Sequence, residues 1–521
     1  MLKFTREETM PVDQKKRMGR VYIIGAGPGD PGLITIKGLQ CIREADVLIY
    51  DHLVSGELLV HAKNPVRLIY AGKQGGDHTL SQDEINRCLV EEAAQGKIVT
   101  RVKGGDPFIF GRGGEEAQVL AKAGIPFEVV PGVTSAIAVP SYAGIPLTHR
   151  GYTSTLAFVT GHEDPAKEKS DINWEALAGI GTLVFLMGVK NLPRIVASLI
   201  SHGKDPETPA ALIRWGTTAD QETLTGTLAN IVQRSEEKRF QPPSIFVVGK
   251  VIDLRGPLDW FEQKPLFGKG VVITRPEAQA AEMRRLLWQQ GARAISFPTI
   301  RILPPESRRV LDEALDRLES YDWIVFTSAN GVRFFLDRLK ETGRDIRDMK
   351  GIRICTIGPA TASILEEMGI RVDLLPDSYI SESVVKAFEK QDIQGRKVLL
   401  PRAETARDVI PEGLTRLGAA VDVVPVYRTA ASEHRKEELE PLLEAGKVDV
   451  ITFTSPSTVM HFLEIMGKDF RLPPQVRIAC IGPVTAAAVR KAGWPVDILR
   501  EEFTIPGLVD AITEYYEGIP K

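Results

Sequence analysis

The sequence predicts an α/β protein made of two consecutive α/β domains, and three observations carry this prediction. Short strand-like apolar runs alternate with helical patterns along the chain. At 521 residues the chain is too long for a single hydrophobic core. The alternation breaks at residues 254–270 (LRGPLDWFEQKPLFGKG), which contain Gly and Pro and mark the best domain boundary.

The expected strands form two groups before this break, and a third begins after it. The first group is 21–24, 47–50, 67–71 and 98–102, and the second is 156–160, 182–187, 210–213 and 244–248. A new strand is expected at 271–274, directly after the break. Two groups of strands before the boundary suggest that the first domain has two subdomains.

Composition and charge exclude several classes of protein. The net charge of −3 and the pI near 6.3 give no electrostatic reason to expect nucleic acid or an anionic membrane as partner. No apolar run approaches the ~18 residues of a membrane helix. Residues 1–18 are charged and lack the apolar region of a signal peptide, so we expect a disordered leader.

The four cysteines are scattered, with no CxxC pair and no nearby paired histidines. This pattern argues against a metal site or a disulfide framework. It is typical of a protein in a reducing cytoplasm, which we expect as the location.

The second half contains an internal repeat. DWIVFTSANGV (322–332) is similar to DVITFTSPSTV (449–459), and RICTIGPATASILEEMG (353–369) to RIACIGPVTAAAVRKAG (477–493). Arg275 and Arg402 are also 127 residues apart in matching positions. A period this long is no solenoid and indicates two similar α/β lobes. A cleft between two lobes is a natural ligand site, although a duplication can also have structural meaning alone.

The loop GAGPGD (25–30) after the first strand invites comparison with dinucleotide-binding loops. Its GxG and an acid about 20 residues later fit that pattern. However, Asp30 stands where the pattern needs glycine, and Pro28 removes a backbone N–H from the loop. The loop therefore predicts close approach of a small ligand to the backbone and not a pyrophosphate cradle.

Several further segments give this loop its context. They are YDHLVS (50–55), GGDPFIFGRGGEE (104–116), VVPGVTSAIAVPSYAGIPLTHRG (129–151), FVTGH (158–162) and LVFLMGV (183–189). With these motifs, residues 19–255 resemble the tetrapyrrole methylases, most closely uroporphyrinogen-III C-methyltransferases. The resemblance implies subdomains of about 19–134 and 150–255 with S-adenosyl-L-methionine in a cleft between them, followed by a linker at 256–268.

The resemblance also implies which residues contact this cofactor and its product, S-adenosyl-L-homocysteine. The first loop, the GGD segment and the hinge between subdomains line the methionine part, and two later positions hold the adenine end. These residues are Pro28, Gly104, Gly105, Asp106, Ile109, Thr134, Ser135, Met187 and Gly216. Without the family, the glycines are equally compatible with a turn and Met187 with a core position.

The implied chemistry is methyl transfer to C2 and C7 of uroporphyrinogen III, giving precorrin-2 on the way to sirohaem or cobalamin. Pyrrole carbons are nucleophiles and a sulfonium is an electrophile, so positioning and proton management suffice. Asp51 and Lys73 match the family's proton acceptor and donor. Asp51 is also compatible with a strand-end turn, and Lys73 with a substrate contact.

The implied substrate carries eight carboxylates, so cationic side chains should line the cleft. The candidates are Arg101, Arg112, His149 and Arg150. Any one such residue is more often solvated or part of a structural ion pair.

The second half resembles uroporphyrinogen-III synthases. The motifs are ITRPEAQA (273–280), FTSANGV (326–332), IGPATA (357–362), LPRAE (400–404), VPVYRT (424–429), FTSPSTV (453–459) and IGPVTA (481–486). The resemblance implies a bilobal α/β fold over 269–521. One lobe would take about 266–297 plus 430–521 and the other about 303–423, with crossings near 296–302 and 424–429.

A synthase of this kind closes hydroxymethylbilane with inversion of ring D and needs no cofactor. Tyr427 matches a family tyrosine that could assist loss of hydroxide, and it also suits a packed strand position. Ser328, Asn330, Ser455 and Thr485 are expected to bind substrate carboxylates.

The two resemblances together predict a bifunctional enzyme, acting on tetrapyrroles and forming a homodimer through its methyltransferase domain. An alternative keeps the fold but changes the methyl acceptor. Another makes the second half a tetrapyrrole-binding module without activity.

Overall fold

The computed structural model describes residues 19–72, 80–162, 171–467 and 469–518. The leader expected at residues 1–18 and the candidate Lys73 lie outside these ranges. The chain divides into two compact units, Met1–Lys269 with Leu287–Arg293, and Gly270–Leu286 with Ala294–Lys521. Four five-stranded sheets, two in each unit, are found in the described residues, which confirms the predicted α/β class.

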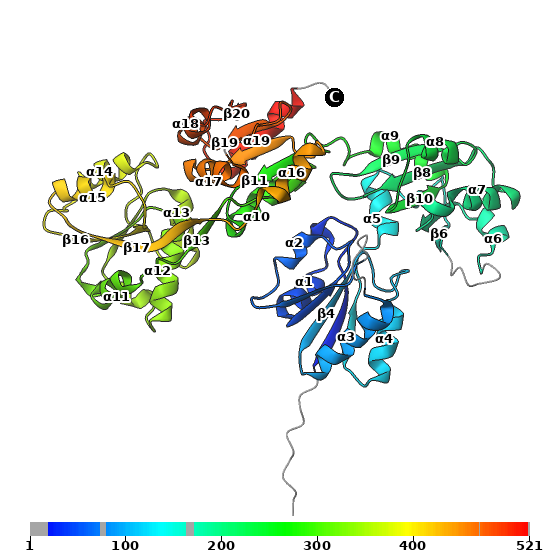
Figure 1. The fold of residues 1–521 in the computed structure, drawn as a ribbon, viewed down its shortest axis with the longest axis horizontal. Coiled ribbons are helices and arrows are strands. Elements are labelled where there is room, and N and C mark those ends of the chain that lie inside the picture. Colours follow the sequence, from blue (N-terminus) through cyan, green and yellow to red (C-terminus); the bar gives the residue numbers. More distant parts are fainter. Residues whose placement is uncertain (1–18, 73–79, 163–170, 468, 519–521) are drawn as a thin grey trace, which may run out of the picture. The chain divides into compact units, whose positions relative to one another are not determined.

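The first sheet of unit 1, which contains the strand labelled β4 in Figure 1, is parallel throughout. Its strand order is β3-β2-β4-β1-β5. Its strands are β1 (Arg20–Gly25), β2 (Val47–Tyr50), β3 (Arg67–Tyr70), β4 (Ile98–Lys103) and β5 (Phe127–Val130). The associated helices are η1 (Pro31–Leu33), α1 (Ile36–Glu44), α2 (Gly56–Leu59), α3 (Gln82–Ala94) and α4 (Gly113–Lys122). All four early strands predicted from sequence are present.

The connections of this sheet leave its central strands in opposite directions. From β1 the chain runs through α1 to β2, while from β4 it runs through α4 to β5 on the other side. Accordingly, Cys41 and Ile42 of α1 pack on one face, and Ala117 and Leu120 of α4 pack on the other. Such a point opens a crevice at the carboxyl ends of β1 and β4, where ligands bind in open α/β sheets.

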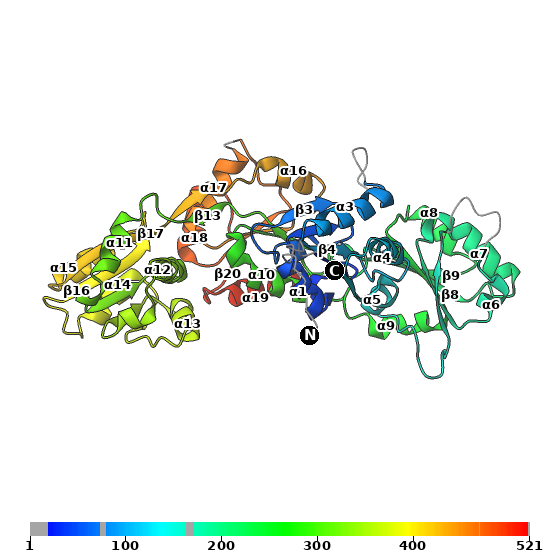
Figure 2. The same cartoon turned by 90° about the horizontal axis from the view of Figure 1, so that it is seen from below.

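The second sheet of unit 1 is mixed, in the order β6-β7-β10-β8-β9, with only the β6–β7 pair parallel. Its strands are β6 (Leu156–Thr160), β7 (Thr182–Leu186), β8 (Pro209–Arg214), β9 (Glu222–Thr227) and β10 (Ser244–Val248). Helices α7 (Leu192–Ser201) and α8 (Ile231–Glu237) pack on one face together with α6 (Trp174–Ala178), and α5 (Ser135–Tyr142) packs on the other (Figure 2). The short helix η2 (Val189–Asn191) precedes α7.

The stretch expected as a linker is packed against unit 1. It follows η3 (Lys250–Leu254) and begins with α9 (Arg255–Leu258). Phe261 and Leu266 are buried, and the Phe261 ring lies 4.8 Å from the ring of Tyr142 in α5. Burial of these apolar side chains, despite the Gly and Pro of the stretch, anchors it to the first unit.

In unit 2 each lobe has its own sheet. The order β12-β11-β18-β19-β20 uses β11 (Gly270–Ile273), β12 (Arg293–Ser296), β18 (Val450–Phe453), β19 (Arg477–Cys480) and β20 (Ile498–Leu499). The order β13-β17-β16-β14-β15 uses β13 (Ile300–Leu303), β14 (Trp323–Phe326), β15 (Arg353–Thr356), β16 (Lys397–Ala403) and β17 (Ala420–Ala431). β13 and β17 pair antiparallel, whereas the β17–β16, β16–β14 and β14–β15 pairs are parallel.

The helices of unit 2 connect these strands. In the lobe containing β11 they are α10 (Glu277–Gln289), α16 (Lys436–Glu444), α17 (Pro456–Met466), α18 (Pro483–Lys491) and α19 (Ile505–Glu517). In the other lobe they are α11 (Arg309–Asp316), η4 (Leu318–Ser320), α12 (Ala329–Glu341), η5 (Ile346–Met349), α13 (Pro359–Glu367), α14 (Ser381–Phe388) and α15 (Val409–Arg416).

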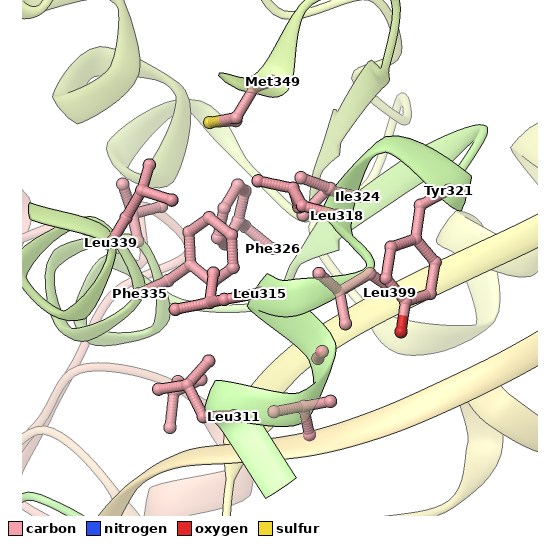
Figure 3. Close-up of a cluster of buried hydrophobic side chains, with 14 of the residues drawn as sticks. Leu311, Leu315, Leu318, Tyr321, Ile324, Phe326, Phe335, Leu339, Met349 and Leu399 are labelled. Carbon is pink, nitrogen blue, oxygen red and sulfur yellow. The ribbon is translucent and has the colours of Figure 1, made fainter. Parts of the chain in front are cut away.

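The core of the second lobe shows how these helices are held. Leu311 and Leu315 of α11 and Phe335 of α12 meet Phe326 of β14 in one buried cluster (Figure 3). These four side chains are at most 2% exposed. Their burial fixes the first turn of α12, where candidate residues of the second half lie.

Candidate functional site

The two glycine loops of unit 1 lie against each other at the crevice between β1 and β4. The N–H of Gly27 donates to the carbonyl of Gly105 at 3.3 Å, and the N–H of Gly105 donates back to the carbonyl of Gly27 at 2.7 Å. A Cβ at Gly25 would lie 2.5 Å from Cα of Gly132, so no side chain fits there. The sequence predicted a tight, small-residue loop here that a small ligand could approach closely, and approach of the ligand stays a prediction.

Asp106 holds the second loop in place. Its Oδ1 accepts the N–H groups of Phe108 at 2.8 Å and Ile109 at 3.1 Å, and its Oδ2 accepts the N–H of Gly132 at 3.0 Å. Both carboxylate oxygens therefore serve the loop itself. Asp106 was expected to contact the cofactor, and these bonds make it an organiser of the surrounding backbone.

Asp30 ties the first loop to the second subdomain. Its Oδ2 accepts the hydroxyl of Tyr142 at 2.6 Å, and its N–H donates to Oγ1 of Thr217 at 3.1 Å. Burial and the Asp30 carboxylate together raise the pKa of Tyr142. Sequence reasoning noted Asp30 as the residue that breaks the dinucleotide pattern, but it did not identify Tyr142 or Thr217 as its partners.

The expected adenine positions have unusual backbone conformations. Met187 has φ 57° and is 52% exposed, and Trp215 and Thr217 on either side of Gly216 have φ 46° and 69°. Positive φ in non-glycine residues is strained and concentrates at ligand sites. A Cβ at Gly216 would lie 2.6 Å from Cγ2 of Val139, so this loop also needs glycine.

The hinge residues begin helix α5. Thr134 is its N-cap and accepts the N–H of Ala136 at 3.3 Å, while Ser135 is the first helical residue. Ile109 is 38% exposed, in keeping with an open site wall. Pro28 and Gly104 lie in the loops that follow β1 and β4.

A buried network of charges stands behind Asp51, which follows β2. Arg101 donates from Nη2 to Oδ1 of Asp51 at 2.6 Å and from Nε to Oε1 of Glu116 at 3.1 Å. Lys103 donates to the same Glu116 oxygen at 2.9 Å. Burial lowers the pKa of Lys103, and Glu116 opposes this lowering.

Arg101 was expected to face substrate, and the structure places it elsewhere. It is 2% exposed and also donates to the carbonyls of Ile49 and Val102. Its donors are thus occupied inside the domain, where it orients Asp51. Glu116 and Lys103 were missed from the sequence because their role depends on β4 lying beside α4.

The other expected substrate cations of unit 1 are at the surface. Arg112 donates to both oxygens of Glu115, at 2.8 and 2.7 Å, and this raises the pKa of Arg112. His149 and Arg150 are exposed, and the His149 ring lies 5.1 Å from that of Tyr152. These cations are accessible to an anionic ligand.

In unit 2, Tyr427 and Ser328 lie together. Their hydroxyl oxygens are 3.1 Å apart, and the Tyr427 ring stacks on Phe334 at 5.9 Å. Ser328 is also the N-cap of α12 and accepts the N–H of Gly331 at 3.0 Å. Tyr427 is 9% exposed, so only a small part of it faces solvent.

The remaining residues of the second half serve local structure in similar ways. Ser455 is the N-cap of α17 and accepts the N–H of Thr458 at 3.3 Å, matching Ser328 in the repeat. Asn330 accepts a hydrogen bond from Nε2 of Gln279 at 3.1 Å. Thr485 lies in α18 and is 3% exposed. Gln279 was not identified from the sequence.

No group of three His, Cys, Asp or Glu side chains among the described residues could hold a metal ion. Among the same residues, no helix combines the length and apolar character needed to cross a membrane.

Known proteins match both halves of the chain. Family models match residues 20–232 (Tetrapyrrole (Corrin/Porphyrin) Methylases) and 281–510 (Uroporphyrinogen-III synthase HemD). The porphyrin biosynthesis protein HemD of Ruminiclostridium josui is 38% identical over 500 residues, covering 96% of this chain and 99% of the relative.

Two further relatives match the first half. The S-adenosyl-L-methionine-dependent uroporphyrinogen III methyltransferase of Methanosarcina barkeri is 54% identical over 237 residues, which are 45% of this chain and 93% of the relative. A solved structure of uroporphyrin-III C-methyl transferase from Thermus thermophilus, complexed with S-adenyl homocysteine, is 38% identical with a TM-score of 0.40. It covers 45% of this chain and 100% of that chain.

Proposed function

Because the chain belongs to the family of porphyrin biosynthesis proteins that join a tetrapyrrole methylase to a uroporphyrinogen-III synthase, we propose that it catalyses two consecutive steps. The half at 269–521 cyclises hydroxymethylbilane to uroporphyrinogen III with inversion of ring D. The half at 19–255 then methylates C2 and C7 to give precorrin-2. The match to one relative along nearly the whole chain is the observation that carries this proposal.

The residues of the first half fit S-adenosyl-L-methionine. At Gly25 and Gly132 the backbone packs too closely for any side chain, and Met187 offers an exposed apolar wall. When bound, this group supplies an electrophilic methyl on a sulfonium. The contacts expected from Pro28 and Ser135, and from the other positions named above, complete the proposed site.

Asp51 is the proposed proton acceptor of the methylation. Its carboxylate is fixed by Arg101 at 2.6 Å and is 28% exposed in its side chain, so it can face a bound substrate. Methylation at a pyrrole carbon makes that ring cationic, and loss of a proton completes the reaction. Lys73 stays the proposed donor, and Arg112, His149 and Arg150 the proposed contacts for substrate carboxylates.

In the second half, Tyr427 is proposed to assist departure of hydroxide from the linear substrate. The hydroxyl of Ser328 lies 3.1 Å away and holds the tyrosine hydroxyl in place; with Ser328 as the donor, the tyrosine O–H is left to donate to the departing hydroxide. Asn330, Ser455 and Thr485 are proposed to bind substrate carboxylates with hydroxyl and amide donors. We propose that this half needs no cofactor, so dialysis against a chelator should leave its rate unchanged.

The function is tested with the full chain and hydroxymethylbilane, with and without S-adenosyl-L-methionine. Uroporphyrinogen III is expected without the methyl donor, and precorrin-2 with it. Formation of uroporphyrin I alone after oxidation contradicts the synthase activity. Absence of methylated product from supplied uroporphyrinogen III contradicts the methyltransferase activity.

Assembly and location are further parts of the proposal. We propose a homodimer formed through the methyltransferase domain, to be measured by light scattering of the purified chain. A cytoplasmic location is proposed from the scattered cysteines and is tested by cell fractionation.

A further inference from the structure

The repeat places two arginines at equivalent positions of the two lobes. Arg275 follows β11 and Arg402 lies near the end of β16, so each stands at the carboxyl end of a strand. In both side chains Nε is buried and has no hydrogen-bond partner within the described residues. The Nε atoms of the two arginines therefore have similar environments.

The two differ in how their charge is compensated. Arg402 donates from Nη2 to the carboxylate of Asp408 at 2.7 Å and from Nη1 to the carbonyl of Arg407 at 3.1 Å. Arg275 donates from Nη2 to the amide oxygen of Gln279 at 3.1 Å, which carries no charge. Arg275 has no carboxylate within 4 Å in the part of unit 2 that the structure describes.

The uncompensated charge of Arg275 is costly. Burial lowers the pKa of its guanidinium, and the attraction of Glu282 opposes this effect only in part. A charge out of water is normally paired with an opposite charge or bound to a ligand. Arg402 follows this rule within the protein, whereas Arg275 pairs with no carboxylate among the described residues.

The position of Arg275 indicates which anion is missing. β11 and β18 are parallel neighbours, so Arg275 and the helix-capping Ser455 emerge at the same edge of their sheet. On its other side, Gln279 accepts from Arg275 and donates to Asn330 at 3.1 Å. Only the Gln279 side chain thus separates Arg275 from Asn330, and Ser455 lies at the same edge of the β11–β18 sheet. Both Asn330 and Ser455 are proposed substrate contacts.

We propose that Arg275 binds a carboxylate of the linear tetrapyrrole substrate in the synthase half, with Gln279 holding its guanidinium in position. This inference rests on the proposed synthase function and adds to it a specific cation. Nη1 of Arg275 donates to no described residue, so it is the group left for the substrate. The planar guanidinium suits a carboxylate better than an ammonium does.

The asymmetry between the lobes also has a consequence. The two lobes are similar in sequence, but only one of the equivalent arginines has been neutralised by an acid of its own lobe. At these two equivalent positions, a linear substrate with two different ends would then meet an unpaired arginine on one lobe and a paired one on the other. Arg275 would in this way fix the direction in which the substrate binds.

The test compares Arg275→Gln with the matched variant Arg402→Gln in the full chain, using hydroxymethylbilane. Loss of a charge-assisted hydrogen bond should raise the KM of Arg275→Gln about 10- to 100-fold, with a smaller change in kcat. Arg275→Lys should recover part of this loss. Arg402→Gln should keep KM within about threefold, because that arginine is paired inside the protein.

Stability and the other activity serve as controls. Removing a partly buried cation without a carboxylate partner should leave the Tm unchanged or raised in Arg275→Gln, and methylation of supplied uroporphyrinogen III should be unaffected. An unchanged KM in Arg275→Gln, or an equal rise in both glutamine variants, overturns the proposal. If Arg275→Gln does not fold, Arg275→Lys decides the question. A wild-type KM for hydroxymethylbilane in that variant overturns the proposal, and a raised KM supports it. A wild-type chain without synthase activity instead refutes the proposed function.

Discussion

Glu116→Gln tests the buried charge network of the methyltransferase domain. Glu116 is fully buried and accepts hydrogen bonds from Arg101, Lys103 and Gln82. The substitution keeps the size of the side chain but leaves two buried cations facing Asp51 alone. Removing one partner of a buried ion pair costs about 3–5 kcal/mol, so we expect a loss of this size near neutral pH.

The loss should depend on pH through Lys103. Its pKa in the folded protein is lowered by burial, so the unfolded lysine binds its proton to higher pH than the folded one. Native stability therefore rises with pH between the lowered pKa and the ordinary value of this lysine. Removal of Glu116 takes away an attraction that keeps the pKa of Lys103 higher. In the variant, native stability therefore begins to rise at a lower pH. Compared at neutral pH and at a pH just below the ordinary pKa of this lysine, the deficit of Glu116→Gln should shrink by up to about 1.4 kcal/mol per pH unit.

The assay is urea denaturation of the full chain at both pH values. The transition of the methyltransferase domain is the one that added S-adenosylhomocysteine shifts to higher urea. Glu115→Gln is the matched control. The Glu115 carboxylate, next to Glu116 in the sequence, pairs with Arg112 at the surface, so its loss should cost less than about 1 kcal/mol of stability. The reasoning is refuted if Glu116→Gln destabilises no more than Glu115→Gln, or if its deficit is the same at both pH values.

Three further substitutions test the proposed sites. Asp51→Asn should lower the kcat of methylation about 10²- to 10⁴-fold while S-adenosylhomocysteine binding by calorimetry stays unchanged; equal losses of both would point to a structural role. Gly25→Ala places a Cβ against Gly132 and the carbonyl of Gly105, so binding of the same ligand should weaken more than about tenfold, and unchanged binding would contradict the close backbone approach. Tyr427→Phe removes the hydroxyl next to Ser328 and should lower synthase kcat at least about tenfold with about 1 kcal/mol lost in stability; a rate within about threefold of wild type would exclude a catalytic role.

The positions of the strands were predicted well from the sequence, because the pattern of apolar residues along the chain reflects which residues are buried. β2 and β6 have the predicted bounds, 47–50 and 156–160, since their residues are apolar and flanked by turn formers. The stretch after residue 255 was expected as a linker because of its Gly and Pro. Its aromatic side chains, Phe261 among them, instead find a buried surface on α5, which composition does not reveal.

The candidate site was predicted unevenly. Motif residues such as Gly105 and Gly216 lie where the chain needs glycine, and this need can be read from short loops at strand ends. The partners of charged residues could not be read in this way. Arg101 was a candidate for substrate binding, with an ion pair as the alternative, because a cation looks the same in the sequence whether it faces solvent or a buried glutamate 15 residues later.

By itself, the sequence determined the α/β class, the internal repeat, the glycine loops and the resemblance of each half to a known family. These depend on local pattern and on motifs that stay recognisable without their surroundings. Only the tertiary structure decided which charges are compensated: Arg101 by Glu116, Arg402 by Asp408, and Arg275 by no carboxylate among the described residues. Compensation depends on distances of a few ångströms between elements far apart in the chain, and the energy of a charge is set by those distances and by burial.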